Sequence, residues 1–325
     1  MMFIRSKLIG FGHCLPAKIL TNDDLSHMVE TSDEWIRSRT GIRSRHIAET
    51  ETTSVIAGQA VSNAIKDAGL KPEDIDLLIL ASITPDNTTP STAVKIAGNL
   101  GFRSGVPAFD ISAACSGFVY ALTLADNMIR LGQVKTAVIA GAECLSKIVD
   151  WQDRNTCVLF GDGAGAVVLQ AEAGTGKSSD RGVLSTHIYA DGALYDCLKT
   201  TGGVSSTQSP GVVTMDGKEV FKHAVVSLAE AAEVVLQEAG LSKSNIDWLI
   251  PHQANVRIVD SVRQRLEIPE DKVIITLDHH GNTSAASIPL ALSESHQKGL
   301  FKDGDVLVLT AMGAGFTWGG AVIRL

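Results

Sequence analysis

The chain has 325 residues, 45% of them hydrophobic and 20% charged, and a formal net charge of −8 at pH 7. This composition is typical of a globular protein with a large core, and it argues against a disordered chain and against general nucleic-acid binding. No apolar run approaches the roughly 20 residues that span a bilayer. The five cysteines include no CxxC pair and no signal-peptide pattern precedes them, so we expect no membrane association, no metal site and a reducing, cytoplasmic location.

The chain repeats a pattern of helix, turn and strand. In residues 64–82 a predicted helix ends at Ala-Gly-Leu, a polar turn follows, and an apolar strand begins after Ile-Asp. Residues 235–253 show the same pattern without a gap. Two weaker matches pair residues 110–122 with 278–292 and residues 163–170 with 319–325. Three matches in the same order predict two similar α/β halves.

Apolar strands alternate with helices, and the clearest strands cover residues 77–82, 136–143 and 305–313. Strands of this kind are typical of mostly parallel sheets that are covered on both faces. Polarity rises and periodicity fades over residues 171–181. We therefore divide the chain into halves of residues 1–172 and 173–325.

Cys115 precedes a predicted helix. Gly132 stands at the position of a C-terminal cap. Apolar residues recur in the helix at three- and four-residue steps: Phe118, Ala121, Leu122, Ala125, Met128 and Ile129. Backbone N–H groups and the helix dipole at such an N-terminus favour a thiolate. A small buried hydrophobic residue is the alternative interpretation of Cys115.

Two glycine-rich segments resemble nucleotide-binding loops. Residues 171–178 match a phosphate loop if Ala171 replaces its first glycine, but Gly182 and a strand-like run follow where a helix is required. Residues 161–165 are likewise followed by a strand. The better interpretation is a polar linker for residues 171–178 and the start of a strand for residues 161–165.

Two polar residues of the second half follow predicted strand ends. His252 comes directly after the strand "DWLIP", and Asn282 lies in the counterpart of the Cys115 segment. In related halves such strand ends face one another, where ligands gather. Singly, His252 could be a core histidine and Asn282 a helix N-cap. Together with Cys115 they indicate an activated nucleophile.

Six motifs, in this order and spacing, resemble those of one family. They are TSDEWIRSRTGIRSRH (31–46), DISAACSGF (110–118), FGDGAGAVVL (160–169), PHQANVRI (251–258), HGNTSAAS (280–287) and GAGFTWGGAV (313–322). Over essentially its whole length the chain resembles the 3-oxoacyl-(acyl-carrier-protein) synthases III, condensing enzymes of the thiolase fold. The resemblance implies an α/β fold of two similar halves in five α-β-α-β-α layers, with two mixed, mostly parallel sheets, and a homodimer.

The resemblance also implies a Cys-His-Asn triad, which falls on Cys115, His252 and Asn282, and an oxyanion hole formed by the N–H groups of Cys115 and Gly315. Cys115 would take the acyl group of an acyl-CoA, with acetyl-CoA as the expected donor. Malonyl carrier protein (malonyl-ACP) would then lose CO₂, and His252 and Asn282 would stabilise the resulting enolate by hydrogen bonds. This is the initiating condensation of type II fatty acid synthesis, and the resemblance implies no permanently bound cofactor.

Related subclasses fit the residues less well. Elongating condensing enzymes carry a second histidine where this chain has Asn282, and biosynthetic thiolases carry a second cysteine that is missing from residues 313–325. Non-catalytic relatives lack the nucleophile that Cys115 supplies. A related condensing enzyme of a polyketide, aryl or long-chain acyl pathway stays an open alternative.

The family's CoA-binding positions fall on Thr31, Trp35, Arg39, Arg154 and Asn255. An indole and a guanidinium can enclose a purine, and arginine pairs with phosphate. The alternatives are a hydrophobic anchor for Trp35, a surface ion pair for Arg154 and a helix N-cap for Asn255.

The carrier-protein positions fall on Gln253, Arg257, Arg263 and Arg265. Arg257 and Arg265 lie two helical turns apart and so face broadly one way. On an acidic chain this cluster could bind an acidic carrier protein, and a solvated helix face is the alternative.

Thr89 occupies the family's acyl-gate position, which acts across the dimer interface. Acetyl-selective bacterial members often carry a bulky Phe there. Threonine therefore predicts a more open tunnel, unless Phe118 or Leu145 closes it from another wall.

Overall fold

The first of two large sheets contains five strands that are spread over the N-terminal half of the chain. The computed structural model describes residues 3–325, and this sheet has the strand order β1-β7-β6-β4-β5. Its strands are β1 (Phe3–Cys14), β4 (Leu77–Ala81), β5 (Ala108–Ile111), β6 (Thr136–Glu143) and β7 (Gly163–Gly174). β7 pairs antiparallel with β1 and β6, whereas β4 pairs parallel with β5 and β6, so β7 alone runs against the other four.

The second sheet repeats this order with one strand fewer. Its order is β11-β12-β13-β8, and the strands are β8 (Gly182–Ala190), β11 (Trp248–Pro251), β12 (Val306–Gly313) and β13 (Thr317–Arg324). β13 runs against its neighbours, as β7 does. An isolated parallel bridge between Leu249 and Val273 takes the place that β5 has in the first sheet. Both sheets are mixed, as expected, but the expectation of mostly parallel pairing is wrong: two of the four pairings in the first sheet and two of the three in the second are antiparallel, because β7 and β13 each run against both neighbours.

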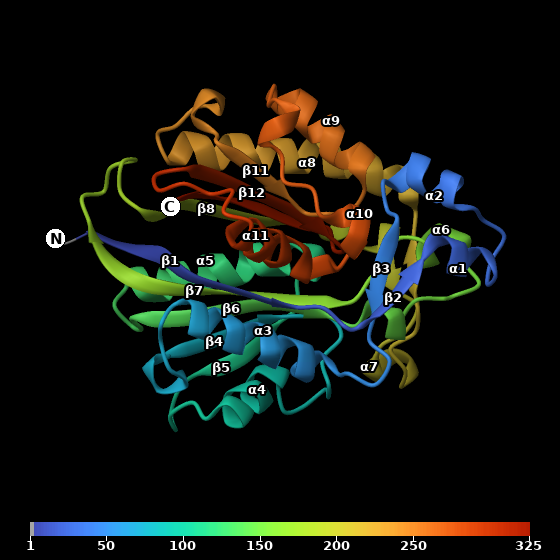
Figure 1. Cartoon of the computed structure of the whole chain (residues 1–325), viewed down its shortest axis with the longest axis horizontal. Helices are drawn as coiled ribbons and strands as arrows, with labels where there is room; N and C mark the ends of the chain where they lie inside the picture. Colours follow the sequence, from blue (N-terminus) through green and yellow to red (C-terminus); the bar gives the residue numbers. More distant parts are fainter. Residues whose placement is uncertain (1–2) are drawn as a thin grey trace.

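The helices form three layers around the two sheets (Figure 1). The central helices α5 (Gly117–Arg130) and α11 (Ser287–Gln297) contact both sheets. α3 (Thr53–Asp67) and α4 (Thr92–Leu100) cover the outer face of the first sheet, and α8 (Gly217–Glu238) and α9 (Val256–Leu266) cover that of the second. The five α-β-α-β-α layers implied by the resemblance are therefore confirmed.

The central helices are buried on most sides because they lie between two apolar sheet faces. In α5, Phe118, Val119, Leu122 and Ile129 are at most 1% exposed and belong to one core that includes residues of both sheets. This explains why the helix after Cys115 is largely apolar.

Smaller elements gather at one end of the molecule, on the right of Figure 1. They are β2 (Lys18–Thr21), α1 (Asn22–Ser26), α2 (Asp33–Thr40), β3 (Ser44–Ile47), α6 (Arg154–Cys157) and α7 (Val204–Thr207), with α10 (Leu277–His280) beside them. β9 (Leu198–Thr200) and β10 (Val213–Met215) form a separate two-stranded sheet.

The glycine-rich segments have the structural roles expected of them. β7 continues to Gly174 and β8 begins at Gly182, with no helix between them, so the segment of residues 171–178 has no phosphate-loop architecture. Residues 163–165 begin β7. The division of the chain after residue 172 stays a prediction. None of the helices described here combines the length and apolar character of a membrane span.

Candidate active site

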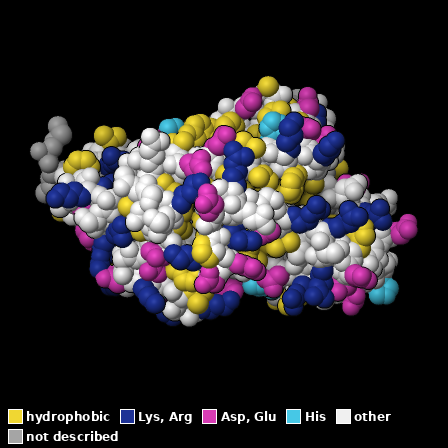
Figure 2. All heavy atoms as spheres, turned by 90° about the horizontal axis from the view of Figure 1, so that it is seen from above, with side chains coloured by type: hydrophobic (Ala, Val, Ile, Leu, Met, Phe, Trp, Pro, Cys, Tyr) yellow, Lys and Arg dark blue, Asp and Glu magenta, His cyan; other side chains and the backbone are white. Residues whose placement is uncertain are grey.

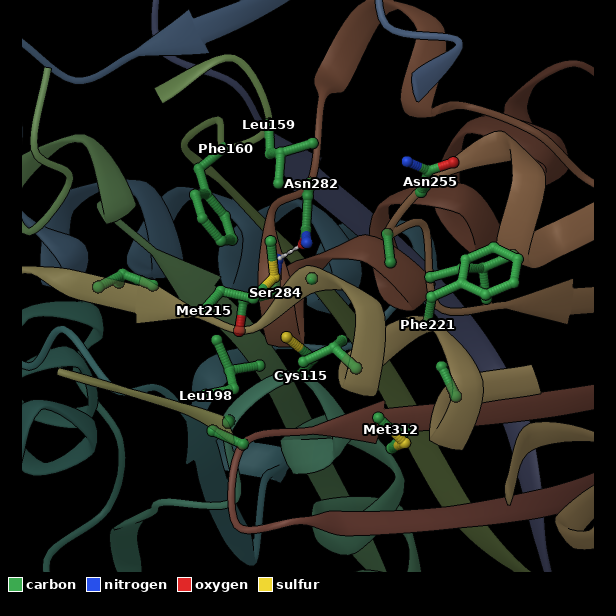
Figure 3. A pocket seen from close by; sticks show the side chains of 18 of the residues that line it. Cys115, Leu159, Phe160, Leu198, Met215, Phe221, Asn255, Asn282, Ser284 and Met312 are labelled. Atoms are coloured by element: carbon green, nitrogen blue, oxygen red, sulfur yellow. Dashed lines mark hydrogen bonds between the residues drawn. The ribbon is translucent and has the colours of Figure 1, made fainter. Parts of the chain in front are cut away.

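Cys115, His252 and Asn282 line one cavity of about 780 Å³ (Figure 3). Cys115 lies in the turn η2 (Ala114–Ser116) directly before α5, as its sequence predicted. His252 follows the end of β11, and Asn282 lies between α10 and the turn η7 (Ser284–Ala286). The two halves of the chain therefore bring together all three predicted residues.

The turn that carries Cys115 is attached to the second half of the chain. The hydroxyl of Thr317 donates to the carbonyl oxygen of Ala113 at 3.0 Å, and the hydroxyl of Ser116 donates to Thr317 Oγ1 at 2.8 Å. A Cβ atom on Gly313 would lie 2.5 Å from the backbone nitrogen of Cys115, so this end of β12 must be glycine. The position of the thiol thus depends on β12 and β13.

The electrostatics of Cys115 differ from the expectation. Burial, together with the nearby Glu143 carboxyl, raises the pKa of its thiol to about 12, although a hydrogen bond with Ser284 lowers it. The loss of water around a charged sulfur therefore outweighs the favourable helix N-terminus. In the resting site the thiol is protonated.

Glu143 is a functional candidate that the sequence did not single out. It ends the apolar strand β6 and is fully buried, and its carboxylate accepts hydrogen bonds from Thr84 Oγ1 at 2.7 Å and Ser82 Oγ at 3.2 Å. Burial raises the pKa of Glu143 to about 7 against these hydrogen bonds. In the sequence Glu143 is simply the last residue of a predicted strand. Only the folded structure shows that it lies near the Cys115 thiol.

The hydrogen bonds of His252 fix the direction in which it can donate. Its Nδ1 lies 2.7 Å from Ser287 Oγ, and that oxygen also accepts the backbone N–H of Gln253 at 3.3 Å. The serine hydrogen is therefore free to point at Nδ1, which leaves the imidazole proton on Nε2. Burial lowers the pKa of His252 to about 3, so the ring is neutral and can donate from Nε2.

Asn282 is oriented in the same manner. Its Oδ1 accepts the backbone N–H of Ser284 at 2.9 Å, the bond drawn in Figure 3. Its backbone is held by Leu159 and Gly161 at 2.8 and 3.0 Å. The amide nitrogen is left as a donor. The N-cap of α11 is Ala286, so Asn282 is not the cap of that helix.

The predicted oxyanion residue Gly315 lies in the turn between β12 and β13. The hydroxyl of Thr317 contacts the carbonyl oxygens of both Ala314 and Ala113, at 3.1 and 3.0 Å, so the turn is held beside the Cys115 segment. Gly315 has φ 137°, a conformation that favours glycine, and Ala314 lines the cavity.

The predicted CoA residues cluster beside the cavity. The guanidinium carbons of Arg39 and Arg154 lie 4.9 and 5.0 Å from the centre of the Trp35 ring. Arg154 also donates to the carbonyl oxygen of Glu30 at 3.0 Å, and no carboxylate partner of Arg154 occurs in the described chain. The hydroxyl oxygen of Thr31 is buried without a hydrogen-bond partner among residues 3–325.

Asn255 combines both of the roles considered for it. Its side-chain oxygen caps α9 by accepting the N–H of Arg257 at 2.9 Å, and its amide nitrogen donates to the carbonyl oxygen of Arg39 at 3.1 Å. The residue also lines the cavity. It therefore links α9 to the end of α2 at the cavity mouth.

The four predicted carrier-protein residues separate into different environments. Gln253 is 1% exposed, and its amide bonds the backbone of Pro251, Ile274 and Thr276, so it is a structural residue and not a docking residue. Arg263 is half-buried and pairs with Asp260.

Arg257 and Arg265 are exposed. Arg265 lies 3.9 Å from Glu230, and Arg257 lines the cavity with its guanidinium 5.9 Å from the Phe221 ring. Figure 2, which views the face formed by α8 and α9, shows basic side chains interspersed with acidic ones. Arg257 is therefore the best placed of the four to meet a ligand that enters the cavity.

The walls of the cavity are mainly apolar and include residues that the sequence did not indicate. They come from several separate elements: Leu145, Phe160, Leu198, Met215, Phe221 and Met312. Leu145, one of the two residues that could close the acyl tunnel in place of Thr89, lines the cavity. Phe118, the other candidate plug, is buried in the core between the sheets. Thr89 is exposed and does not line the cavity of its own chain.

Comparisons with known proteins agree on one family. Sequence models of 3-oxoacyl-(acyl-carrier-protein) synthase III and of its C-terminal part match residues 109–192 and 236–325. A β-ketoacyl-(acyl-carrier-protein) synthase III from Rhodospirillum centenum is 55% identical over 324 residues, which cover 99% of this chain and 100% of that protein.

Solved structures give the same result. The 3-oxoacyl-(acyl-carrier-protein) synthase III of Aquifex aeolicus is similar with a TM-score of 0.92 and 48% identity, covering 98% of this chain and 100% of the other. A priming β-ketosynthase from the R1128 polyketide pathway has a TM-score of 0.91 and 34% identity, with 98% and 96% covered.

The raised pKa of the Cys115 thiol leads to a prediction about alkylation. Because the pKa of Cys115 is raised to about 12, its iodoacetamide alkylation rate should rise about tenfold per pH unit from pH 7 to 10 without a plateau. Glu143→Gln removes a nearby negative charge, so it should lower the pKa of Cys115 and increase the rate at each pH. Peptide mass spectrometry identifies the labelled cysteine, with Cys115→Ser as the control. A wild-type plateau below pH 8 would show that the helix N-terminus outweighs burial.

Proposed function

The chain belongs to the 3-oxoacyl-(acyl-carrier-protein) synthase III family, and we propose that the cavity around Cys115 carries out the reaction of this family. The reaction is the initiating condensation of type II fatty acid synthesis, in which an acyl-CoA and malonyl-ACP give 3-oxoacyl-ACP, CoA and CO₂. The chain is accordingly an acyltransferase. The observation that carries the assignment of residues is the meeting of one thiol and two oriented neutral donors in one cavity.

In the first half-reaction the sulfur of Cys115 attacks the thioester carbonyl of acyl-CoA. The carbon–sulfur bond to CoA breaks, an acyl-cysteine forms, and the proton of the Cys115 thiol ends on the released CoA thiol. The oxyanion formed on the way needs donors, which we assign to the backbone N–H groups of Cys115 and Gly315. The hydrogen bonds of Thr317 to both segments support this assignment because they hold the two N–H groups on neighbouring turns.

In the second half-reaction malonyl-ACP loses CO₂, and the electron pair of the broken carbon–carbon bond forms a thioester enolate. We assign the stabilisation of its oxygen to Nε2–H of His252 and the amide of Asn282. Both groups are neutral donors whose other polar atoms are already bonded to Ser287 and Ser284. The enolate carbon then attacks the acyl-cysteine, and Cys115 leaves as a thiolate that regains a proton.

We assign the mouth of the cavity to the CoA nucleotide. Trp35 offers an aromatic face, and Arg39 and Arg154 offer guanidinium groups for stacking and for phosphate oxygens. The unpartnered hydroxyl of Thr31 is a further polar contact. Asn255 lies where the pantetheine arm would pass into the cavity. No permanently bound cofactor is part of the proposed reaction.

We assign the docking of the acidic carrier protein to Arg257, with Arg265 and Arg263 as outer contacts on the same helix. Arg257 is exposed at the cavity mouth, so a carrier bound there would deliver its pantetheine arm to Cys115. Gln253 is not included among these carrier-protein contacts because its side chain is buried. We further propose a cytoplasmic enzyme that needs neither nucleic acid nor membrane.

We propose a homodimer in which Thr89 faces the partner's acyl tunnel. β5 is an edge strand, and in the described residues its second edge has no strand partner. Asp110 of β5 accepts the backbone N–H groups of Thr92 and Ala93 at 2.7 Å each, so the loop with Thr89 is fixed beside that free edge. A subunit that adds to β5 would therefore meet this loop.

A condensing enzyme of a specialised pathway is the second candidate function. The fold similarity to a polyketide priming ketosynthase and the long apolar wall of the cavity favour it. Assays with a series of acyl-CoAs against malonyl-ACP distinguish the two, since a fatty-acid enzyme should prefer short primers.

The function is tested by following the two half-reactions separately. With acyl-CoA alone, intact-protein mass spectrometry should show one acyl group, on Cys115, and none in Cys115→Ser. His252→Ala and Asn282→Ala should still acylate but lose about two to three orders of magnitude in malonyl-ACP decarboxylation, because each removes one oxyanion donor. Label mainly on Cys144 or Cys157, or near wild-type condensation in either variant, would overturn the assignment.

Arg257→Glu should weaken condensation with malonyl-ACP and leave acylation by acyl-CoA nearly unchanged. The loss should shrink as salt rises, because exposed charges are screened over about 8 Å at physiological ionic strength. Arg181→Glu is the matched control, since Arg181 is a partly exposed arginine that pairs with Asp303 and does not line the cavity. Equal losses in both half-reactions would show a general structural defect instead of a docking role.

Thr89 leads to a prediction about chain length. Each buried methylene contributes about 0.8 kcal/mol, so a tunnel left open by threonine should accept acyl-CoAs longer than butyryl as well as acetyl-CoA. Thr89→Phe should remove the longer substrates and largely keep acetyl transfer. Competition assays with acyl-CoA mixtures measure the preference. Strict acetyl specificity that Thr89→Gly does not change would exclude Thr89 as the gate.

A further inference from the structure

Two adjacent histidines, neither of which lines the cavity, converge on one carboxylate. His279 and His280 end α10, and Glu294 lies on the central helix α11. Nε2 of His279 lies 3.0 Å and Nε2 of His280 lies 3.2 Å from the same oxygen, Oε2 of Glu294. Their spacing in the sequence is not that of a common metal motif, so the sequence alone predicts no metal site here.

The distances match a transition-metal site. Zinc binds histidine nitrogen and carboxylate oxygen at about 2.0–2.2 Å, so two ligand atoms of a tetrahedral site are about 3.4 Å apart. The three ligand atoms here all lie within 4.8 Å of one another. Small side-chain movements would place an ion between them. Among residues 3–325 this is the only such group of histidine, cysteine and acidic side chains.

The surroundings orient the ligand atoms. Nδ1 of His279 bonds Asp278 Oδ1 at 2.8 Å, so Nε2 is the nitrogen that points toward Glu294, and this carboxylate–histidine pairing is common behind metal-bound histidines. Lys298 contacts the other oxygen of Glu294, Oε1, and so leaves Oε2 available. His280 is 3% exposed, whereas His279 is half-exposed and provides access.

We propose that His279, His280 and Glu294 form a binding site for a divalent transition-metal ion of the zinc type, with a fourth position open to water. The ion replaces any proton on the two Nε2 atoms, and that proton is released to solvent. It would tie α10 to α11. Because Gly281 and Asn282 directly follow α10, a bound ion would also stiffen the segment that carries the proposed enolate donor.

The same contacts also occur in an ion-pair network without metal, and binding experiments separate the two. Tag-free full-length protein is incubated with ZnCl₂, desalted and measured by elemental mass spectrometry, and its melting temperature is recorded with ZnCl₂ or MgCl₂. We expect one zinc per chain and a higher melting temperature with zinc but not with magnesium, which prefers oxygen ligands. His279→Ala should weaken zinc binding by at least about tenfold.

The controls locate the ion. His187→Ala removes a histidine that pairs with Glu238 outside the cluster, and it should bind zinc as the wild type does. Cys115→Ser should also keep the ion, which excludes binding at the thiol. Glu294→Gln should lose the ion, and His279→Ala keeps the test valid if the change at the partly buried Glu294 impairs folding. No retained zinc in the wild type, or equal zinc in wild type and His279→Ala, would overturn the proposal.

Discussion

The cavity depends on one close backbone contact between the two halves of the molecule. A Cβ atom on Gly141 of β6 would lie 2.1 Å from the carbonyl oxygen of Ala285 in η7, so only glycine lets the strand and the turn meet. This contact brings the end of β6, with Glu143, against the segment that carries Asn282. The missing side chain on β6 at this point therefore lets the second half bring its amide donor close to Cys115. A larger residue would separate the thiol from its partners without touching any of them.

The same close packing determines which groups in the cavity are charged. Burial keeps the Cys115 thiol protonated and the His252 ring neutral, and it brings the pKa of Glu143 to about 7. A neutral imidazole and an amide suit an enolate, because they stabilise a developing negative charge without removing a proton from it. The first half-reaction is different, since it requires a thiolate that the loss of water around the sulfur disfavours. The oxyanion donors and the CoA leaving group must therefore act together with the loss of the thiol proton.

Much of the fold could be predicted because periodicity and repetition are local properties of the sequence. The repeat of residues 64–82 at 235–253 gives the same helix end, turn and strand in both halves, and it led to His252 at a strand end. Long-range contacts could not be predicted in this way. Gln253 lies in a motif beside surface residues, yet its amide is used inside the protein by three backbone groups. The apolar wall from β9 and β10 likewise has no periodic signal, because those strands are only three residues long.

Both halves use the same strained turn at the site. Ala114 and Ser284 begin the matching turns η2 and η7 with φ values of 45° and 51°, in the left-handed region that non-glycine residues seldom adopt. Such a residue costs on the order of 1–3 kcal/mol. The outer helices α3 and α8 begin without a residue of this kind, so the strain is not needed to start a helix. What the two turns share is their position directly before a central helix, with Ala114 and Ser284 lining the cavity. The duplicated turn has therefore taken two chemical roles, since one copy presents the thiol of Cys115 and the other holds Asn282 through the backbone N–H of Ser284.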